Sequence, residues 1–169
     1  TNFDPGGFAE YIRIPRINVA TGTFRLPEEV SYDAGVFIEP LACVVRGHRA
    51  AAIEPGQSVL VIGSGMSGLL HVQLAMATGA GKIFATDISK YRLQAAERFG
   101  AHTLPTGDDL PSALRDANDG KLADRTFLCA GSPSAAEAAF ECAERCGLVQ
   151  LFAPPDPDYR SSLNLNRLW

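Results

Sequence analysis

A glycine-rich segment is the part of this 169-residue sequence whose residue types and spacing best suit a chemical task. Residues 63–68 read GSGMSG, and they follow a short apolar run, SVLVI. In a GxGxxG turn the first glycine allows a tight bend, the second lets the main chain approach a pyrophosphate, and the third lets a helix pack closely on a strand. The amides and the positive dipole end of the following helix bind phosphates. We therefore predict that a dinucleotide contacts Gly63, Gly65, Met66, Ser67 and Gly68.

An aspartate, Asp87, lies about 20 positions after this turn, at the end of the next apolar run. A carboxylate at that point accepts hydrogen bonds from the ribose hydroxyls in the adenosine half of a dinucleotide. The same charge repels a 2′-phosphate, and Ile88 and Ser89 add no positive charge beside it, so the sequence favours NAD over NADP. Arg92 has two interpretations, which are contact with the adenosine end of NAD and an exposed position on a helix.

Two further segments lie where predicted strands end. Ala130 and Gly131 follow a strand that ends at Cys129, and ligands of doubly wound sheets bind outside the carboxyl ends of the strands. We predict that both residues contact NAD, although a glycine here also suits a plain turn. Phe152 ends the last strand, where its backbone would face the nicotinamide amide and its side chain would belong to the core or its rim.

A parallel sheet is needed to position these residues, and the chain alternates strands and helices in the required way. Strands are expected at 58–62, 82–86, 101–104, 125–129 and 148–153, and helices at 40–51, 66–78, 89–99, 110–118 and 133–146. Earlier, 8–15 and 18–26 are expected to form short strands. The alternation argues for right-handed βαβ crossovers, and the fold class is therefore α/β, a doubly wound Rossmann sheet with flanking helices.

Composition excludes several classes of partner. The net charge is −4 and the cationic residues are scattered, so no surface for a nucleic-acid backbone is expected. No apolar run reaches the roughly 18 residues that cross a membrane. The four cysteines lie in or beside apolar stretches without CxxC pairs, which favours a reducing, cytoplasmic location. The opening residues TNFDPGG suit a loop entered from an earlier segment, so we expect a piece of a longer protein.

The order of these segments resembles the medium-chain, zinc-dependent alcohol dehydrogenase family, and within it the sorbitol and threonine dehydrogenase branch. The similarity rests on GGFAEY at 6–11, FRLP at 24–27, IEPLA at 38–42, the turn at 59–68, and Thr86-Asp87 with Arg92. It implies that residues 1–38 are the end of a β-rich, GroES-like catalytic domain with a hinge. Residues 39–169 would be an NAD-binding Rossmann domain, incomplete at its C-terminal end. The resemblance also implies a homo-oligomer.

The resemblance further implies an enzyme that transfers a hydride between NAD and a secondary alcohol or ketone, with zinc as Lewis acid. A polyol, sugar, amino alcohol or simple alcohol would be the substrate. Glu39 would then bind zinc or lie next to it, whereas from the residues alone it is also a favourable acid at a helix start. The family's principal zinc ligands, a cysteine and a His-Glu pair, correspond to positions before Thr1. This chain alone is expected to bind NAD weakly and to catalyse nothing.

The cysteines and histidines of the sequence itself suit structural roles. Cys142 and Cys146 lie one helical turn apart without a nearby histidine and are interpreted as packing residues. His48, His71 and His102 are isolated in sequence and are interpreted as structural or surface residues. Two alternatives stay open. One is a zinc-free quinone or enoyl reductase that uses NADPH, against which Asp87 and the Glu39-Pro40 pair argue. The other is a non-catalytic module that senses NAD.

Overall fold

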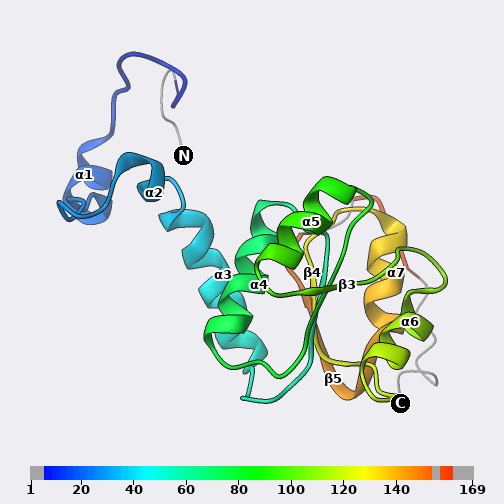
Figure 1. Cartoon of the computed structure of the whole chain (residues 1–169). Helices are drawn as coiled ribbons and strands as arrows, with labels where there is room; N and C mark the ends of the chain where they lie inside the picture. Colours follow the sequence, from blue (N-terminus) through cyan, green and yellow to red (C-terminus); the bar gives the residue numbers. More distant parts are fainter. Residues whose placement is uncertain (1–5, 154–156, 162–169) are drawn as a thin grey trace. The chain divides into compact units, whose positions relative to one another are not determined.

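The chain divides into two compact units, Thr1–Ile38 and Glu39–Trp169, each of which is described by itself. The computed structural model describes residues 6–153 and 157–161 (Figure 1). All the residues that the sequence analysis assigns to a nucleotide site lie in the second unit.

The first unit is helical where it is regular, with α1 at Arg16–Gly22 and α2 at Tyr32–Gly35. The strands expected at 8–15 and 18–26 are wrong, because no strand forms between residues 6 and 38. Alternating side chains stabilise a strand when one of its faces packs on a core, and Phe8 and Phe24 are fully or largely exposed. The described residues 6–38 therefore do not show a β-rich piece, and their assignment to the end of a GroES-like domain with a hinge stays a prediction.

The second unit is built on a parallel five-stranded sheet. The strands lie in the order β3-β2-β1-β4-β5, so β2 and β3 lie on one side of β1 and β4 and β5 lie on the other. Their bounds are β1 Val59–Ile62, β2 Ile83–Thr86, β3 His102–Thr103, β4 Ala123–Leu128 and β5 Ala143–Leu151. Strand β1 is buried at every position, as its uninterrupted apolar run predicts, and Val59 is paired with Ile83 on one side and Arg125 on the other. The predicted doubly wound sheet is thus confirmed.

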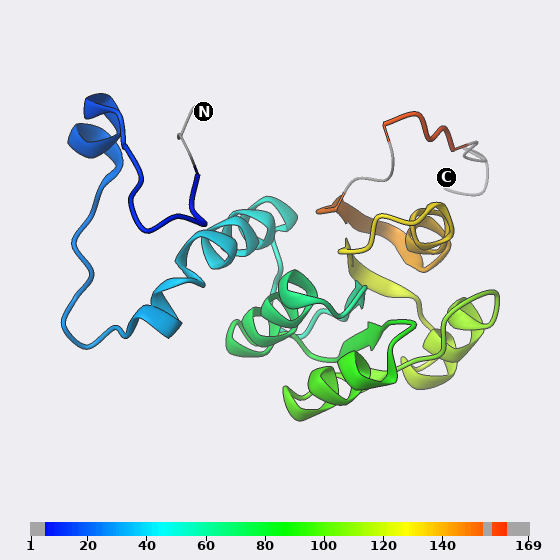
Figure 2. The ribbon, with the colours of Figure 1, turned by 90° about the horizontal axis from the view of Figure 1, so that it is seen from above.

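Helices cover both faces of the sheet (Figures 1 and 2). Their bounds are α3 Ile38–Ala51, α4 Met66–Ala77, α5 Lys90–Arg98, α6 Leu110–Ala117 and α7 Pro133–Glu141. Helices α3, α4 and α5 bury Ala51, Val72 and Ala96 against one face. Helices α6 and α7 bury Leu114 and Ala139 against the other face. The two apolar layers hold the carboxyl ends of β1, β2 and β4 together, where the predicted site residues lie.

The end of α7 is the main place in this unit where the expected boundaries are wrong. The helix ends at Glu141 rather than Cys146, and β5 begins at Ala143 rather than at residue 148. Good helix formers continue past Glu141, but the buried Cys142 carbonyl accepts a hydrogen bond from the Ala123 amide of β4 (2.9 Å). Cys146 then adopts a left-handed backbone (φ 61°) where the β4–β5 register shifts. Pairing with β4 therefore overrides local helix propensity.

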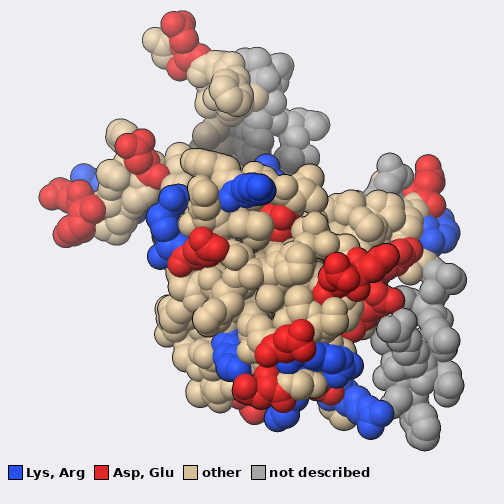
Figure 3. Space-filling model, turned by 45° about the vertical axis from the view of Figure 1, so that its right-hand side comes forward, with Lys and Arg blue, Asp and Glu red and all other residues tan. Residues whose placement is uncertain are grey.

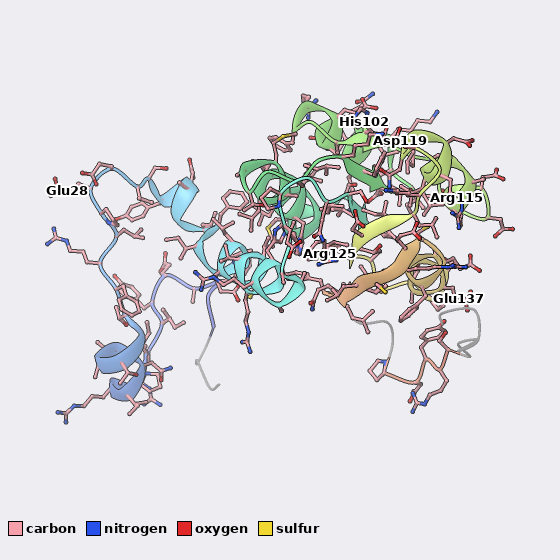
Figure 4. All side chains as sticks on the ribbon, turned by 90° about the horizontal axis from the view of Figure 1, so that it is seen from below. Glu28, His102, Arg115, Asp119, Arg125 and Glu137 are labelled. Carbon is pink, nitrogen blue, oxygen red and sulfur yellow. The ribbon has the colours of Figure 1, made fainter. Side chains whose placement is uncertain are left out.

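Arg125 of β4 fixes the C-terminal end of α3 (Figure 4). Its Nε donates to the carbonyl of Ala51 at 2.7 Å and its Nη2 donates to that of Ala52 at 3.2 Å. The last carbonyls of a helix have no partner within it, and cationic side chains also favour the negative end of the helix dipole. Ala52 itself holds the left-handed conformation (φ 46°) that usually favours glycine after a helix.

Replacing Arg125 by methionine is expected to lower the free energy of unfolding by about 1–2 kcal/mol, because two carbonyls lose their charged donor. Chemical denaturation of the two chains measures the difference. Ala52→Gly is the matched control at the same helix end and should stabilise the chain, because glycine adopts this backbone without strain. Equal stability of the Arg125→Met chain and its parent would contradict the assigned role.

The structure also shows how charged side chains are distributed and whether any helix is long and apolar enough to cross a membrane. On the face shown in Figure 3, lysine and arginine lie among aspartate and glutamate and gather in no single block. Within residues 6–153 and 157–161, no helix has the length and apolar character of a membrane span.

Candidate functional site

The glycine turn joins β1 to α4, and each of its three glycines meets a different environment. Gly63 has φ of 94°, and a Cβ there would lie 2.9 Å from both the Cys129 carbonyl carbon and the Ala130 Cβ. A Cβ on Gly68 would overlap the carbonyl oxygen of Gly63. Gly65 differs, because its φ is −72° and a Cβ there would meet no protein atom within 4 Å. The protein therefore needs Gly63 and Gly68 for its own packing, whereas Gly65 leaves free space.

The N-terminus of α4 faces that free space. Gly65 is the N-cap residue, and no side chain caps the helix. The first helical bond runs from the Leu69 amide to the Gly65 carbonyl (2.9 Å). The preceding amides of a helix need an outside partner, and the dipole makes that end attractive to anions. A pyrophosphate suits this end of α4.

Asp87 follows β2 and links the turn to the next loop. Its Oδ2 accepts a hydrogen bond from the Ser64 amide at 2.7 Å, and its Oδ1 accepts one from the Ser89 amide at 2.7 Å. The Arg92 guanidinium lies 3.7 Å from Oδ2, with the Asp87 side chain 4% exposed and that of Arg92 55% exposed. Each carboxylate oxygen accepts more than one hydrogen bond, so Asp87 holds the turn and retains capacity for a ligand hydroxyl.

These residues border one cavity of about 510 Å³ at the carboxyl ends of β1, β2 and β4. Of the residues predicted from sequence, Gly63, Gly65, Asp87, Arg92, Ala130 and Gly131 line it. The cavity lies where neighbouring strands connect to opposite sides of the sheet, and doubly wound sheets bind their ligands at this point. The cavity size lies within the range of small-molecule sites.

Four predicted residues lie outside the lining. Gly68 packs beneath the turn, Met66 is 53% exposed, and Ser67 is half-buried in the first turn of α4. Phe152 follows β5 and donates its amide to the Leu128 carbonyl (3.0 Å). Its contact with NAD stays a prediction.

The lining also contains residues that the sequence analysis did not identify. The loop between β3 and α6 contributes Thr106, Gly107 and Asp108. Helix α7 contributes Ser134, Glu137 and Glu141, and its N-cap residue Ser132 also lines the cavity. Ser132 caps α7 by accepting the Ala135 amide at 3.2 Å. The rule that ligands lie at carboxyl ends of strands could have pointed to the loop after β3, but α7 enters the lining only through tertiary packing. Glu137 also accepts a hydrogen bond from the Tyr159 hydroxyl at 3.1 Å (Figure 4).

Glu39 lies in the first turn of α3 and is exposed. The Cys43 thiol, one turn further on, donates to its Oε1 at 3.2 Å, and this hydrogen bond raises the pKa of the thiol. The described residues bring together no group of three or more histidine, cysteine, aspartate or glutamate side chains that could hold a metal. They therefore do not form a zinc site by themselves, and the zinc-proximal role of Glu39 stays a prediction.

A comparison with known families identifies the family to which the chain belongs. Residues 68–169 match the model of a family described as "Zinc-binding dehydrogenase". The chain belongs to the zinc-binding dehydrogenase family. The resemblance seen in the sequence is thereby confirmed.

Individual relatives agree with this membership. The chain is similar to sorbitol dehydrogenase of Bacillus subtilis, with 29% identity over 152 residues that cover 89% of this chain and 42% of the relative. It is 37% identical over 143 residues to galactitol 1-phosphate 5-dehydrogenase of Escherichia coli K12, covering 82% of this chain and 39% of the relative. The chain thus spans about two fifths of the length of these curated relatives.

The fold comparison gives the same family. A solved structure of a candidate zinc-binding dehydrogenase from Sinorhizobium meliloti 1021, bound to NADP, superposes with a TM-score of 0.77 at 25% identity. The superposition covers 85% of this chain and 43% of the other.

Proposed function

We propose that this chain is the nucleotide-binding part of an NAD-linked dehydrogenase that interconverts a secondary alcohol and a ketone. The observation that carries the proposal is the space beside Gly65, which lies in a 510 Å³ cavity with Asp87 on its wall. The protein's own packing does not require a glycine at this uncapped helix N-terminus. A ligand that passes close to the main chain explains why a glycine stands there. Sugar alcohols and their phosphates are the substrate class, because the named activities of relatives are on sorbitol and galactitol 1-phosphate.

The residues of this chain bind and orient the cofactor in this proposal. The amides at the start of α4 receive the pyrophosphate, and Asp87 accepts hydrogen bonds from the adenosine ribose. Bound NAD supplies a nicotinamide ring that accepts the hydride removed from the alcohol carbon. Ala130 and Gly131 border the path of the cofactor along the sheet edge, and Arg92, near Asp87, lies at its adenosine end.

NAD is preferred over NADP in the proposal for an electrostatic reason. A 2′-phosphate on the adenosine ribose would lie against the Asp87 carboxylate, and the lining includes further acids, among them Asp108 and Glu137. Arg92 is the one cation of the described lining. Because the similar structure from S. meliloti is bound to NADP, the affinities of this chain for NAD and NADP should both be measured.

The other properties of the whole protein form part of the same proposal. Zinc would polarise the substrate oxygen, held mainly by residues that this chain does not supply, with Glu39 beside it. Assembly into a homo-oligomer and a cytoplasmic location are also proposed, and the four free thiols of Cys43, Cys129, Cys142 and Cys146 suit a reducing compartment.

Asp87→Asn tests the assignment of the adenosine site. The variant keeps one acceptor oxygen and loses the charge, so the affinity for NAD should fall about 10-fold and the preference for NAD over NADP should narrow. Calorimetric titration with both nucleotides measures the two effects.

Asp108→Asn is the matched control, because Asp108 is a second carboxylate of the lining and should change NAD affinity little. If Asp87→Asn bound both nucleotides as tightly as the parent, Asp87 would have no role in recognition. If the parent chain and the whole protein both failed to bind either nucleotide, the proposed function would be wrong.

A further inference from the structure

Two histidines that are 23 residues apart in sequence meet beneath the sheet, on the face covered by α3 and α4. The Nε2 atom of His48 on α3 lies 3.0 Å from the Nδ1 atom of His71 on α4, within hydrogen-bond distance. His48 is 7% exposed and His71 is fully buried. Although the two histidines are isolated in sequence, their rings pair and link the two helices, which agrees with their interpretation as structural residues.

Aromatic rings enclose the pair. The ring of Phe127 in β4 stacks on that of His48, with centroids 4.8 Å apart, and lies 4.3 Å from that of His71. The ring of Phe152 meets His71 edge-on at 4.6 Å. Gly47 makes room for this arrangement, because a Cβ there would lie 3.4 Å from the Cε1 of His71 and 3.6 Å from the Phe152 ring. The pair thus sits in an apolar environment with little space for solvent.

The number of N–H groups on the two rings shows why this environment favours the neutral pair over a protonated one. Two neutral imidazoles carry one N–H each, and the bond between them uses one of these. The other N–H then lies on an outer nitrogen, and the outer nitrogens, His48 Nδ1 and His71 Nε2, are buried without a partner. The neutral pair therefore leaves one donor and one acceptor unpaired. A third proton would leave two unpaired donors and add a charge, which is more costly.

Among the described residues, no acid beside the pair offsets such a charge. Helix α4 carries no charged residue, and the charged residues nearest to the pair on α3, Arg46 and Arg49, are exposed cations. On β4, Asp124 accepts hydrogen bonds from Ser58, and Arg125 is bound to the end of α3. Burial lowers the pKa of His48 to about 4, and burial together with the charge of His48 lowers the pKa of His71 to about 3.

We propose that His48 and His71 form an acid-releasable latch between α3 and α4, closed while both imidazoles are neutral and opened by their protonation. The latch rests on the fold of the second unit and is independent of the proposed enzymatic function. Its release would free α3, which carries Glu39 at its first turn, from the helix that begins at the glycine turn.

The direction of the pH effect follows from the two protonation states. When α3 separates from α4, solvent reaches both imidazoles and their pKa values return to about 6.5. Below pH 6.5 the opened form therefore takes up protons that the closed form excludes, and opening becomes easier as the pH falls toward about 4. Between pH 7 and pH 5 the opening equilibrium should rise about 20-fold for each histidine.

Amide hydrogen exchange of the 169-residue chain at pH 7 and pH 5, corrected for intrinsic exchange rates, tests the latch. The protection of amides in α3 should fall about 20-fold or more, while that of amides in α5, on the same face of the sheet, should change much less. In His48→Leu/His71→Leu, which fills the site with apolar groups that do not titrate, this fall should disappear. His102→Asn, which removes the exposed third histidine, should retain it.

Titration of the imidazole nitrogens in the parent chain, followed by NMR, provides a readout that needs no variant to fold. Both rings of the pair should stay neutral at pH 5.5. Titration of His48 and His71 near pH 6.5 would overturn the proposal. So would an equal loss of protection in α3 and α5, or the same loss in the double leucine variant as in the parent.

Discussion

A chain with Gly65→Ala should fold as stably as its parent and lose 10- to 100-fold of its affinity for NAD. The added methyl group meets no protein atom within 4 Å, and the φ of −72° at this position suits alanine. The space that it fills is the space that the proposal gives to the pyrophosphate. A methyl group forced into an occupied contact costs about 1–3 kcal/mol, which corresponds to this loss of affinity.

Two measurements separate this expectation from a general effect of a methyl group. Unfolding by urea should give the same midpoint for Gly65→Ala and the parent, while calorimetry with NAD should show the loss. Gly22→Ala is the matched control, because a Cβ at Gly22 also meets nothing within 4 Å but lies in α1, outside the cavity. If Gly65→Ala bound NAD as tightly as Gly22→Ala, the nucleotide would not pass beside Gly65, and the glycine turn would be structural only.

The arrangement of β1, α4 and β2 could be predicted from sequence because several signals there agree. An uninterrupted apolar run predicts a buried strand, GxGxxG predicts the turn, and an acid about 20 residues later predicts the end of the next strand. Crossover connections make β1, β2 and β4 parallel, so their carboxyl ends, with Asp87 and Ala130, lie at one edge of the sheet. Six of the predicted site residues line one cavity for this reason.

The end of α7 and the structure of residues 8–15 could not be predicted from local sequence patterns. The helix that ends at Glu141 was expected to continue, because helix propensity does not record the pairing of β4 with β5. The alternation at 8–15 resembles a strand, but it forms one only when one face is covered. In both cases the deciding contacts lie outside the segment itself.

The histidine pair shows an intermediate case. His48 lies on the buried stripe of α3 with Val44 and Ala51, at the spacing of one helix face. The sequence analysis left this histidine as a structural or surface residue, and the structure shows that it is buried. Its partner lies on another helix, and only the packing of α3 beside α4 brings the two rings together.

The remaining prediction concerns the third glycine of the turn, for which we expect the opposite result from Gly65. Gly68→Ala should lower the free energy of unfolding by about 3 kcal/mol or more, because its methyl group would overlap the Gly63 carbonyl oxygen. That oxygen belongs to the backbone of a turn whose first residue already has φ of 94°, and Val61 closes the other side with a side-chain carbon 3.3 Å from the added Cβ. The strand and the helix must therefore separate to admit the methyl group.

Denaturation by urea measures this loss, and Ser67→Ala is the matched control in the same helical turn, with an expected change below about 0.5 kcal/mol. A Gly68→Ala chain as stable as the parent would mean that α4 does not pack on β1 as closely as the structure shows. Nucleotide affinity should fall along with stability in Gly68→Ala, whereas in Gly65→Ala it should fall alone. This contrast assigns one glycine to the fold and the other to the ligand, although both belong to the same six-residue motif.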